Sequence, residues 1–219
     1  MSPKHSKSAI IRVLIVDDHA VVRRGLRQIL EDELKKAEFG EAENAHEALD
    51  RIRKEKWDVI VLDINMPGRS GMEVLKEVKQ THPSLPVLVL SMYPEEQYAI
   101  RVLKSGAAGY MTKETAPEAL VQAVRKVMSG GKYVSSSLAE KLASELDADT
   151  EKPIHEKLSD REYEILLLIG AGKTTRVIAG ELSLSPKTVD TYRRRVLDKM
   201  HMQNNAELIQ YTIRHQLVD

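Results

Sequence analysis

Short apolar runs rich in Val, Ile and Leu alternate with segments of helical periodicity from residue 11 to about residue 131. This alternation is typical of β–α units around a parallel sheet, because strands that are buried on both faces have nearly continuous apolar sequences. We distinguish five repeats, with strands near residues 11–17, 38–43, 59–64, 86–91 and 108–112 and helices near residues 20–31, 45–55, 71–80, 95–105 and 117–129. The pattern therefore predicts an α/β domain with a five-stranded parallel sheet.

The remainder of the chain has a different organisation. Residues 132–152 contain a short predicted helix through Leu138, Leu142 and Leu146, capped by the serines at 135–137, and then an acidic stretch; we interpret them as a linker. Beyond Pro153 the periodicity is helical throughout, with helices expected at residues 159–171, 174–182, 185–200 and 205–216. Ser159 and Glu162 have the spacing of a capping box. We predict a disordered tail at residues 1–10, the α/β domain at 11–131, the linker at 132–152 and a small all-α domain at 153–219.

Composition narrows the functional classes. A length of 219 residues suits two domains. No apolar run reaches the roughly 18 residues that a membrane-spanning helix needs, and the N-terminus lacks the apolar core of a secretory signal. The absence of cysteine excludes disulfides and thiolate metal sites. Because Lys plus Arg and Asp plus Glu both number 33, binding to nucleic acid would require a local cluster of positive charge.

Three acidic residues lie where predicted strands end. Asp17 and Asp18 follow the first strand, and Asp63 ends the third. Each of them alone is more simply explained as a solvated turn residue. However, the carboxyl ends of parallel strands form the edge at which ligands collect, so these three carboxylates are expected to converge there. Oxygen ligands of this kind suit Mg²⁺, and one of the three could accept a phosphoryl group.

Other groups required for phosphoryl transfer are expected at the same edge of the sheet. A Pro-Gly pair at residues 67–68 turns the chain after Asp63, Ser91 ends the fourth strand, and Lys113 follows the fifth. Phosphoryl transfer needs a nucleophile, a metal ion, and a cation with donors for the phosphoryl oxygens. A lone Ser or Lys at a strand end is usually solvent-exposed, but the joint occurrence of these residues favours a functional site.

This set of residues resembles the receiver domain of bacterial two-component response regulators across residues 11–131. The resemblance is carried by Asp17-Asp18, Asp63, Met66-Pro67-Gly68, Ser91, Gly109-Tyr110 and Lys113. It implies a doubly wound, flavodoxin-like fold. It further implies that Lys113 pairs with the phosphoryl oxygens. Ser91 and Tyr110 would form a switch pair, in which the hydroxyl moves to the phosphate and the ring swings inward.

The same resemblance implies the role of each acidic residue. Asp63 would accept the phosphoryl group from a sensor histidine kinase, with only slow self-dephosphorylation afterwards and no other enzymatic activity. The side chains of Asp18 and Asp63 and the backbone carbonyl of Asn65 would bind Mg²⁺. Asp17 would contact the ion through water.

Positive charge is concentrated on one predicted C-terminal helix. Residues 185–200 contain five cations and two acids, whereas residues 153–219 contain ten cations and nine acids. Charge runs are commonly solvated helix surfaces, but here a short helix and a Ser-Leu-Ser-Pro turn precede the run, as in a helix-turn-helix. Val189, Val196 and Met200 share one face of this helix, and Arg194 lies opposite as the candidate guanine contact. The other candidates are Asp190 and Thr191 for base edges, and Lys187, Tyr192, Arg193 and Lys199 for phosphates.

The C-terminal sequence resembles the LuxR-type helix-turn-helix of NarL/FixJ response regulators over roughly residues 157–218. The match includes Leu158-Ser159-Asp160-Arg161-Glu162, Ile178-Ala179, Thr188-Val189 and Lys199-Met200. We interpret the chain as a bacterial cytoplasmic transcription factor, without a membrane partner, that is switched by phosphorylation at Asp63. Implied partners are a sensor histidine kinase, double-stranded DNA with a two-fold operator, a second copy of the active chain, and RNA polymerase. The last helix, apolar at Leu208, Ile209 and residues 211–213, is the candidate dimer contact.

Two other interpretations remain open. A Mg²⁺-dependent phosphatase or phosphotransferase would share the three carboxylates and the aspartyl nucleophile. The sequence, however, has no Asp-x-Asp at the nucleophile and no cap insertion. The second alternative is a receiver that acts only through protein partners, with a degenerate helix-turn-helix.

Overall fold

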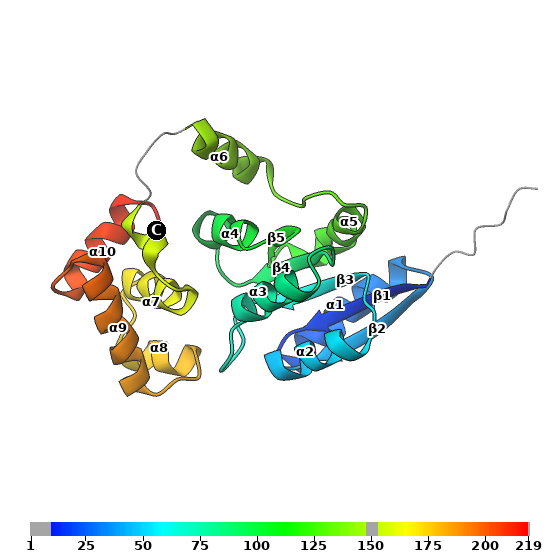
Figure 1. Cartoon of the computed structure of the whole chain (residues 1–219), viewed down its shortest axis with the longest axis horizontal. Coiled ribbons are helices and arrows are strands. Elements are labelled where there is room, and N and C mark those ends of the chain that lie inside the picture. Colours follow the sequence, from blue (N-terminus) through cyan, green and yellow to red (C-terminus); the bar gives the residue numbers. More distant parts are fainter. Residues whose placement is uncertain (1–9, 148–152, 219) are drawn as a thin grey trace, which may run out of the picture.

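The computed structural model describes residues 10–147 and 153–218. Most of the predicted tail, at residues 1–9, and part of the predicted linker, at residues 148–152, lie outside the described residues. Figure 1 shows an α/β domain with a central sheet and, beside it, a helical domain built from the C-terminal part of the chain.

The α/β domain contains a five-stranded, fully parallel sheet, which confirms the predicted fold class. The strands are β1 (Ile11–Val16), β2 (Ala37–Ala42), β3 (Val59–Asp63), β4 (Val87–Ser91) and β5 (Gly109–Thr112). Their spatial order is β2-β1-β3-β4-β5. The order reverses between β1 and β3, and ligands collect at such a switch point in doubly wound folds.

Helices cover both faces of the sheet, because successive strand residues point to opposite sides. Val13 and Ile15 pack in a core with α1 (Ala20–Glu33) and α5 (Ala116–Met128). Leu14 and Val16 pack on the other side with α2 (Ala45–Lys54), α3 (Gly71–Thr81) and α4 (Glu95–Lys104). All ten predicted elements of this domain are present, with ends within two residues of those expected.

The C-terminal region is helical, as the periodicity predicts. It contains α6 (Ser136–Asp147), the 3-10 helix η1 (Ile154–Lys157), α7 (Asp160–Gly170), α8 (Thr175–Glu181), α9 (Pro186–Met200) and α10 (Asn205–Arg214). The capping box of Ser159 and Glu162 is formed at the start of α7, and the Ser185 side chain caps α9. The 3-10 turn was not predicted. None of the described helices is long and apolar enough to cross a bilayer.

The backbone at Gly71, where α3 begins, lies very close to the backbone at the end of β3. A Cβ atom at Gly71 would lie 2.1 Å from the carbonyl oxygen of Asp63. Only glycine therefore allows the first turn of α3 to pack directly against the end of β3. The loop between Asp63 and Ser70 thus joins the end of β3 to the start of α3.

Candidate functional site

The carboxyl edge of the sheet brings the predicted acidic residues together. Asp17 follows β1 and Asp63 ends β3, and these strands are direct neighbours. Potential ligand atoms of Asp17, Asp18, His19 and Asp63 all lie within 4.8 Å of one another. Asp17 and Asp63 are 0% and 1% exposed. The burial of two carboxylates this close together requires a cation to compensate them.

Lys113 supplies one such cation. Its Nζ atom lies 2.7 Å from Asp63 Oδ2 and 2.7 Å from Asp17 Oδ2. Burial raises the pKa of the Asp63 carboxyl, Lys113 opposes this shift, and Asp17 adds to it. Burial also acts to lower the pKa of Lys113, but Asp63 and Asp17 together outweigh it and hold that pKa above its usual value. Lys113 is therefore a fixed positive charge beside the Asp63 carboxylate.

The donor set suits a hard divalent cation. Asp18 Oδ1 is buried and accepts no hydrogen bond from any described residue, although His19 Nδ1 lies 3.0 Å away. The backbone N–H of Asn65 donates to Asp63 Oδ1 over 2.9 Å, so the chain turns tightly around the Asp63 carboxylate. Carboxylate oxygens with an unsatisfied lone pair are the ligands that Mg²⁺ prefers. The residues present thus fit the ion that the sequence predicts.

His19 is a member of this cluster that the sequence reasoning missed. Its backbone N–H donates to Asp17 Oδ1 over 2.7 Å, and its ring nitrogen Nδ1 lies 3.4 Å from the same oxygen. The only signal in the sequence is its position directly after Asp17-Asp18. His19 N-caps α1, and its ring stays largely exposed.

Ser91 and Tyr110, the predicted switch pair, are neighbours in the structure. The Ser91 hydroxyl donates to Asn65 Oδ1 over 3.1 Å and accepts from the Tyr93 backbone N–H over 3.0 Å. The Tyr110 hydroxyl donates to the Tyr93 carbonyl over 2.7 Å. Burial raises the pKa of Tyr110, and a hydrogen bond with Ser91 opposes the shift. The Tyr110 side chain is only 1% exposed, so its ring is buried in this structure.

We predict that Lys113→Ala separates phosphorylation from response. Asp63 remains in place, so some labelling by acetyl phosphate should persist, whereas the ammonium that would link the phosphoryl oxygens to the loop after β5 is lost. The measurement compares labelling at saturating Mg²⁺ with binding to operator DNA in a gel-shift assay. Lys113→Arg, which keeps the positive charge, is the control. A fully activated Lys113→Ala protein in the gel-shift assay would contradict the assignment.

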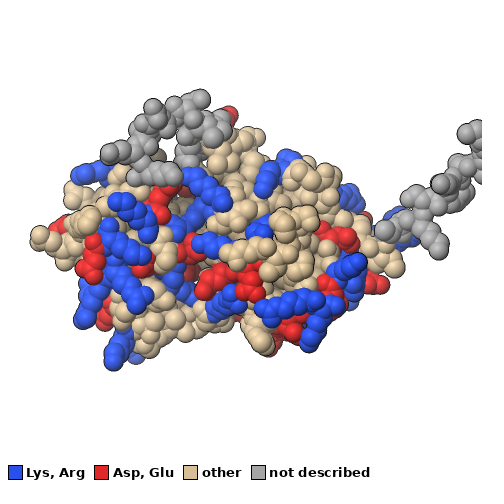
Figure 2. All heavy atoms as spheres, viewed as in Figure 1, with Lys and Arg blue, Asp and Glu red and all other residues tan. Residues whose placement is uncertain are grey.

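Helix α9 carries the exposed positive charge of the helical domain. Val189, Val196 and Met200 form the buried stripe, as predicted, and pack in the core with α7 and α8. Arg194 and Thr191 are exposed on the side away from that stripe. Figure 2 shows Lys and Arg side chains gathered over the end of the molecule where Figure 1 places α8 and α9. An exposed, cationic helix following a short helix is the arrangement of a DNA-reading helix-turn-helix.

Several of the predicted DNA-contacting side chains also have partners within the protein. Asp190 pairs with Arg193, whose guanidinium also donates to Asn205 Oδ1 over 3.2 Å. Lys199 Nζ lies 2.6 Å from a carboxylate oxygen of Glu162, which is buried at the start of α7. Lys199 therefore ties α9 to α7 in this structure. The predicted contacts that are exposed on α9 are Lys187, Thr191, Arg194 and Lys199, and of these Lys199 is paired with Glu162.

The last helix contributes to the core of the same domain. Leu208 and Thr212 of α10 are fully buried. Ile213 is 57% exposed and lies outside the core. The part of the predicted dimer contact that is available to a partner is therefore limited to the outer side of α10.

Comparisons with known proteins identify the class to which this fold and site belong. The family described as the response regulator receiver domain matches residues 13–125. The family described as bacterial regulatory proteins of the luxR family matches residues 156–212. The chain belongs to the two-component response regulators with a LuxR-type DNA-binding domain, and it is a transcription factor.

Individual relatives match across almost the whole chain. Response regulator GacA of Pseudomonas viridiflava is 37% identical over 211 residues, which cover 96% of this chain and 99% of GacA. Response regulator UvrY of Escherichia coli is 36% identical over 209 residues, covering 95% of this chain and 96% of UvrY. The structure of Salmonella typhimurium RcsB has a TM-score of 0.64 and 26% identity, with coverage of 95% and 98%. A structure of an RcsB–DNA complex has a TM-score of 0.57 and 27% identity, with coverage of 96% and 100%.

Membership of this family also supports a Mg²⁺ site in the acidic pocket. Receiver domains typically bind Mg²⁺ in an acidic pocket, and this chain has such a pocket at Asp17, Asp18 and Asp63. A receiver domain implies a histidine kinase as partner, and the LuxR-type domain implies DNA.

Proposed function

We propose that this chain is a sequence-specific transcription factor switched by phosphorylation of Asp63. The observation that carries the proposal is the position of Lys113, 2.7 Å from the buried carboxylates of both Asp63 and Asp17 at the carboxyl edge of the sheet. Asp18, Asp63 and the Asn65 carbonyl would hold Mg²⁺, with Asp17 contacting it through water. The bound ion would neutralise charge on the phosphoryl oxygens.

The reaction is a direct transfer to the carboxylate. An Asp63 oxygen forms a bond to phosphorus while the phosphorus–nitrogen bond of a phosphohistidine donor breaks, and the donor nitrogen leaves with the bonding electrons. Lys113 would stabilise the charge on the phosphoryl oxygens, and Ser91, which in this structure donates to Asn65 Oδ1, would donate a hydrogen bond to them after it leaves Asn65. Only slow hydrolysis of the acyl phosphate should follow.

DNA binding by the activated protein would occur through α9. Arg194 would contact guanine, Asp190 and Thr191 neighbouring base edges, and the phosphate contacts would come from Lys187, Tyr192, Arg193 and Lys199. The similarity to the RcsB–DNA complex supports the DNA-bound role. We propose that the phosphorylated chain dimerises and binds a two-fold operator, with RNA polymerase as a further partner.

The proposed organisation assigns residues 11–131 to the receiver, 132–152 to the linker and 153–219 to the DNA-binding domain, in a bacterial cytoplasmic protein. Helix α6 then occupies most of the linker.

One experiment separates this function from that of a phosphatase or phosphotransferase. Incubated with acetyl phosphate and Mg²⁺, the protein should incorporate up to one phosphoryl group per chain and show no comparable turnover of phosphomonoesters. Intact-mass spectrometry measures the first quantity and phosphate release the second. Sustained multiple turnover of phosphomonoesters would replace the receiver assignment with the enzyme. Phosphorylated protein that does not select any DNA sequence would favour a receiver with a degenerate helix-turn-helix.

A further inference from the structure

Arg23, near the start of α1, reaches back to the loop that carries two of the acidic residues of the pocket. Its Nη1 atom donates to the backbone carbonyl of Asp17 over 2.7 Å. That carbonyl belongs to the peptide group that joins Asp17 to Asp18, and a peptide group is planar. The hydrogen bond therefore fixes the orientation of the plane between two residues whose carboxylates form the acidic pocket.

The Arg23 guanidinium is itself held by the neighbouring strand. Its Nε atom donates to Glu41 Oε2 over 3.3 Å, and Glu41 Oε1 accepts from Arg27 Nη1, also over 3.3 Å. Glu41 belongs to β2 and lies opposite Ile15 of β1. The Arg23 side chain is only 13% exposed, and hydrogen bonds to a charged group are stronger where water is largely excluded. Arg23 thus ties the end of β1 to both α1 and β2.

The carboxylate of Asp18 is weakly restrained by other side chains. Its Oδ1 atom is buried and accepts no hydrogen bond from the described residues. The ring nitrogen of His19 lies 3.0 Å from this atom, but the His19 side chain is 65% exposed. Asp17, in contrast, is held at both oxygens, by the His19 backbone N–H and by Lys113. The direction of the Asp18 carboxylate therefore depends strongly on the backbone that precedes it.

We propose that Arg23 is a positioning residue of the metal pocket. It fixes the peptide group between Asp17 and Asp18 and so holds both carboxylates in place for Mg²⁺. The inference rests on the proposed binding of Mg²⁺ by these residues. A side chain that orients a metal ligand in this way typically contributes about 10–100-fold to the affinity for the metal.

Charge and positioning have opposite effects on a bound cation. A guanidinium near the pocket repels Mg²⁺, so the loss of its charge alone would tighten Mg²⁺ binding. The loss of its hydrogen bond to Asp17 would instead loosen the peptide group and weaken Mg²⁺ binding. The sign of the change in affinity therefore shows which of the two effects dominates.

The test measures the Mg²⁺ affinity of the full-length protein from the chemical shifts of backbone amides near the pocket. Arg23→Ala should bind Mg²⁺ about 10–100-fold more weakly than the unaltered protein. Arg24→Ala is the matched control, because Arg24 is the adjacent, exposed arginine and its Nε donates to the Ala20 carbonyl of its own helix. This control should bind Mg²⁺ at least as tightly as the unaltered protein.

Two further measurements separate positioning from a general loss of stability. The chemical shifts report on folded molecules, so a smaller folded fraction does not change the affinity that they give. Labelling of Arg23→Ala by acetyl phosphate should need more Mg²⁺ for its half-maximal rate, but it should reach the rate of the unaltered protein at saturating Mg²⁺. The bound ion then holds the carboxylates in place of Arg23.

Arg23→Lys decides the question if Arg23→Ala does not fold. It keeps the positive charge, but an ammonium group lacks the fixed fork of donors with which the guanidinium contacts Asp17 and Glu41 together. We expect it to bind Mg²⁺ more weakly than the unaltered protein although the net charge is the same.

A double-mutant cycle tests whether Glu41 acts through Arg23. Glu41→Ala should weaken Mg²⁺ binding in the unaltered protein and have a much smaller effect in the presence of Arg23→Ala. Fully additive effects would show that Glu41 does not hold Arg23 for this purpose and would overturn that part of the inference.

An unchanged or higher Mg²⁺ affinity of Arg23→Ala would overturn the role of Arg23, as would a labelling rate that stays low at saturating Mg²⁺. An equal loss of affinity in Arg24→Ala would assign the effect to the charge of α1 and would also overturn it. If Arg23→Ala does not fold, an unchanged affinity of Arg23→Lys has the same meaning. In all these cases the unaltered protein still binds Mg²⁺ and is labelled. Failure of the unaltered protein to bind Mg²⁺ or to be labelled by acetyl phosphate would instead overturn the proposed function itself.

Discussion

The Asp63→Asn protein is expected to incorporate no phosphoryl group from acetyl phosphate at any Mg²⁺ concentration. The amide preserves the shape of the side chain but is not a nucleophile. We expect the fold to be retained, because Lys113 keeps its 2.7 Å contact with Asp17. Intact-mass spectrometry measures labelling, and circular dichroism measures the fold.

Asp50→Asn is the matched control for this experiment, since Asp50 is an exposed carboxylate of the same domain that pairs with Lys54. Its labelling should equal that of the unaltered protein. Stoichiometric labelling of Asp63→Asn would show that the phosphoryl group is accepted elsewhere.

Arg194→Ala should weaken binding to the specific operator by roughly 1–3 kcal/mol and relax the preference at one base position, as expected for the loss of a bidentate contact with guanine. We choose Arg194 for its position: it is exposed on α9, on the side opposite the buried stripe of Val189, Val196 and Met200. Affinity for operator and random duplexes, together with a binding-site selection, measures both effects.

Lys187→Ala is the comparison variant for a phosphate contact. It should weaken binding to all sequences similarly and reduce the slope of log affinity against log salt by about one. Lys199 would be a poorer choice, because its substitution would leave the buried Glu162 carboxylate without its 2.6 Å partner and disturb the packing of α9 on α7. If Arg194→Ala lost equal affinity for operator and random DNA, with an unchanged base preference, our placement of α9 in the groove would be wrong.

Local patterns were sufficient to predict the framework of both domains. Apolar runs such as residues 59–62 indicate buried parallel strands, and the capping residues Ser159 and Ser185 mark helix starts within one residue. Because the carboxyl ends of parallel strands share one edge, the convergence of Asp17, Asp18 and Asp63 could also be predicted before any distance was known.

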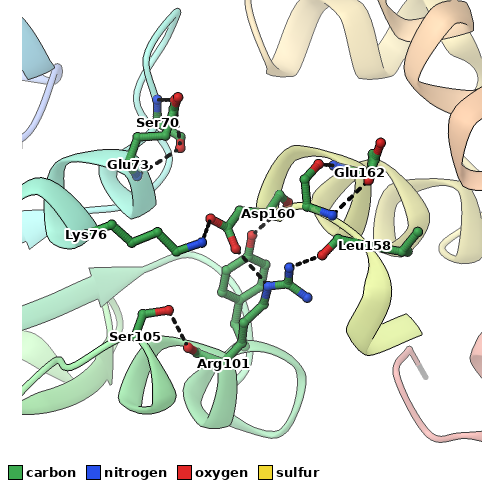
Figure 3. Close-up of polar contacts among 10 residues, drawn as sticks. Ser70, Glu73, Lys76, Arg101, Ser105, Leu158, Asp160 and Glu162 are labelled. Carbon is green, nitrogen blue, oxygen red and sulfur yellow. Dashed lines mark hydrogen bonds and ion pairs between the residues drawn. The ribbon is translucent and has the colours of Figure 1, made fainter. Parts of the chain in front are cut away.

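The contacts between elements distant in the sequence could not be predicted in this way. Asp160 meets Lys76 and Arg101 across 84 and 59 residues (Figure 3), and Lys199 meets Glu162 across 37. Such pairs leave no periodic signal, since any exposed acid could pair with any exposed cation.

The arrangement of the sheet also divides the proposed phosphorylation site into parts of different expected local stability. Strands β3 and β4 are buried along their whole length, so their amides can exchange with solvent only through large-scale opening. Asp63 and Ser91 terminate these strands, whereas Asn65 and Tyr93 belong to the loops beyond them. Loops generally open at a lower cost in free energy than buried strands, so we expect these loops to open while the strands stay closed. The proposed nucleophile is thus anchored at the end of a fully buried strand, and we expect the loop groups around it to exchange partners within the native state.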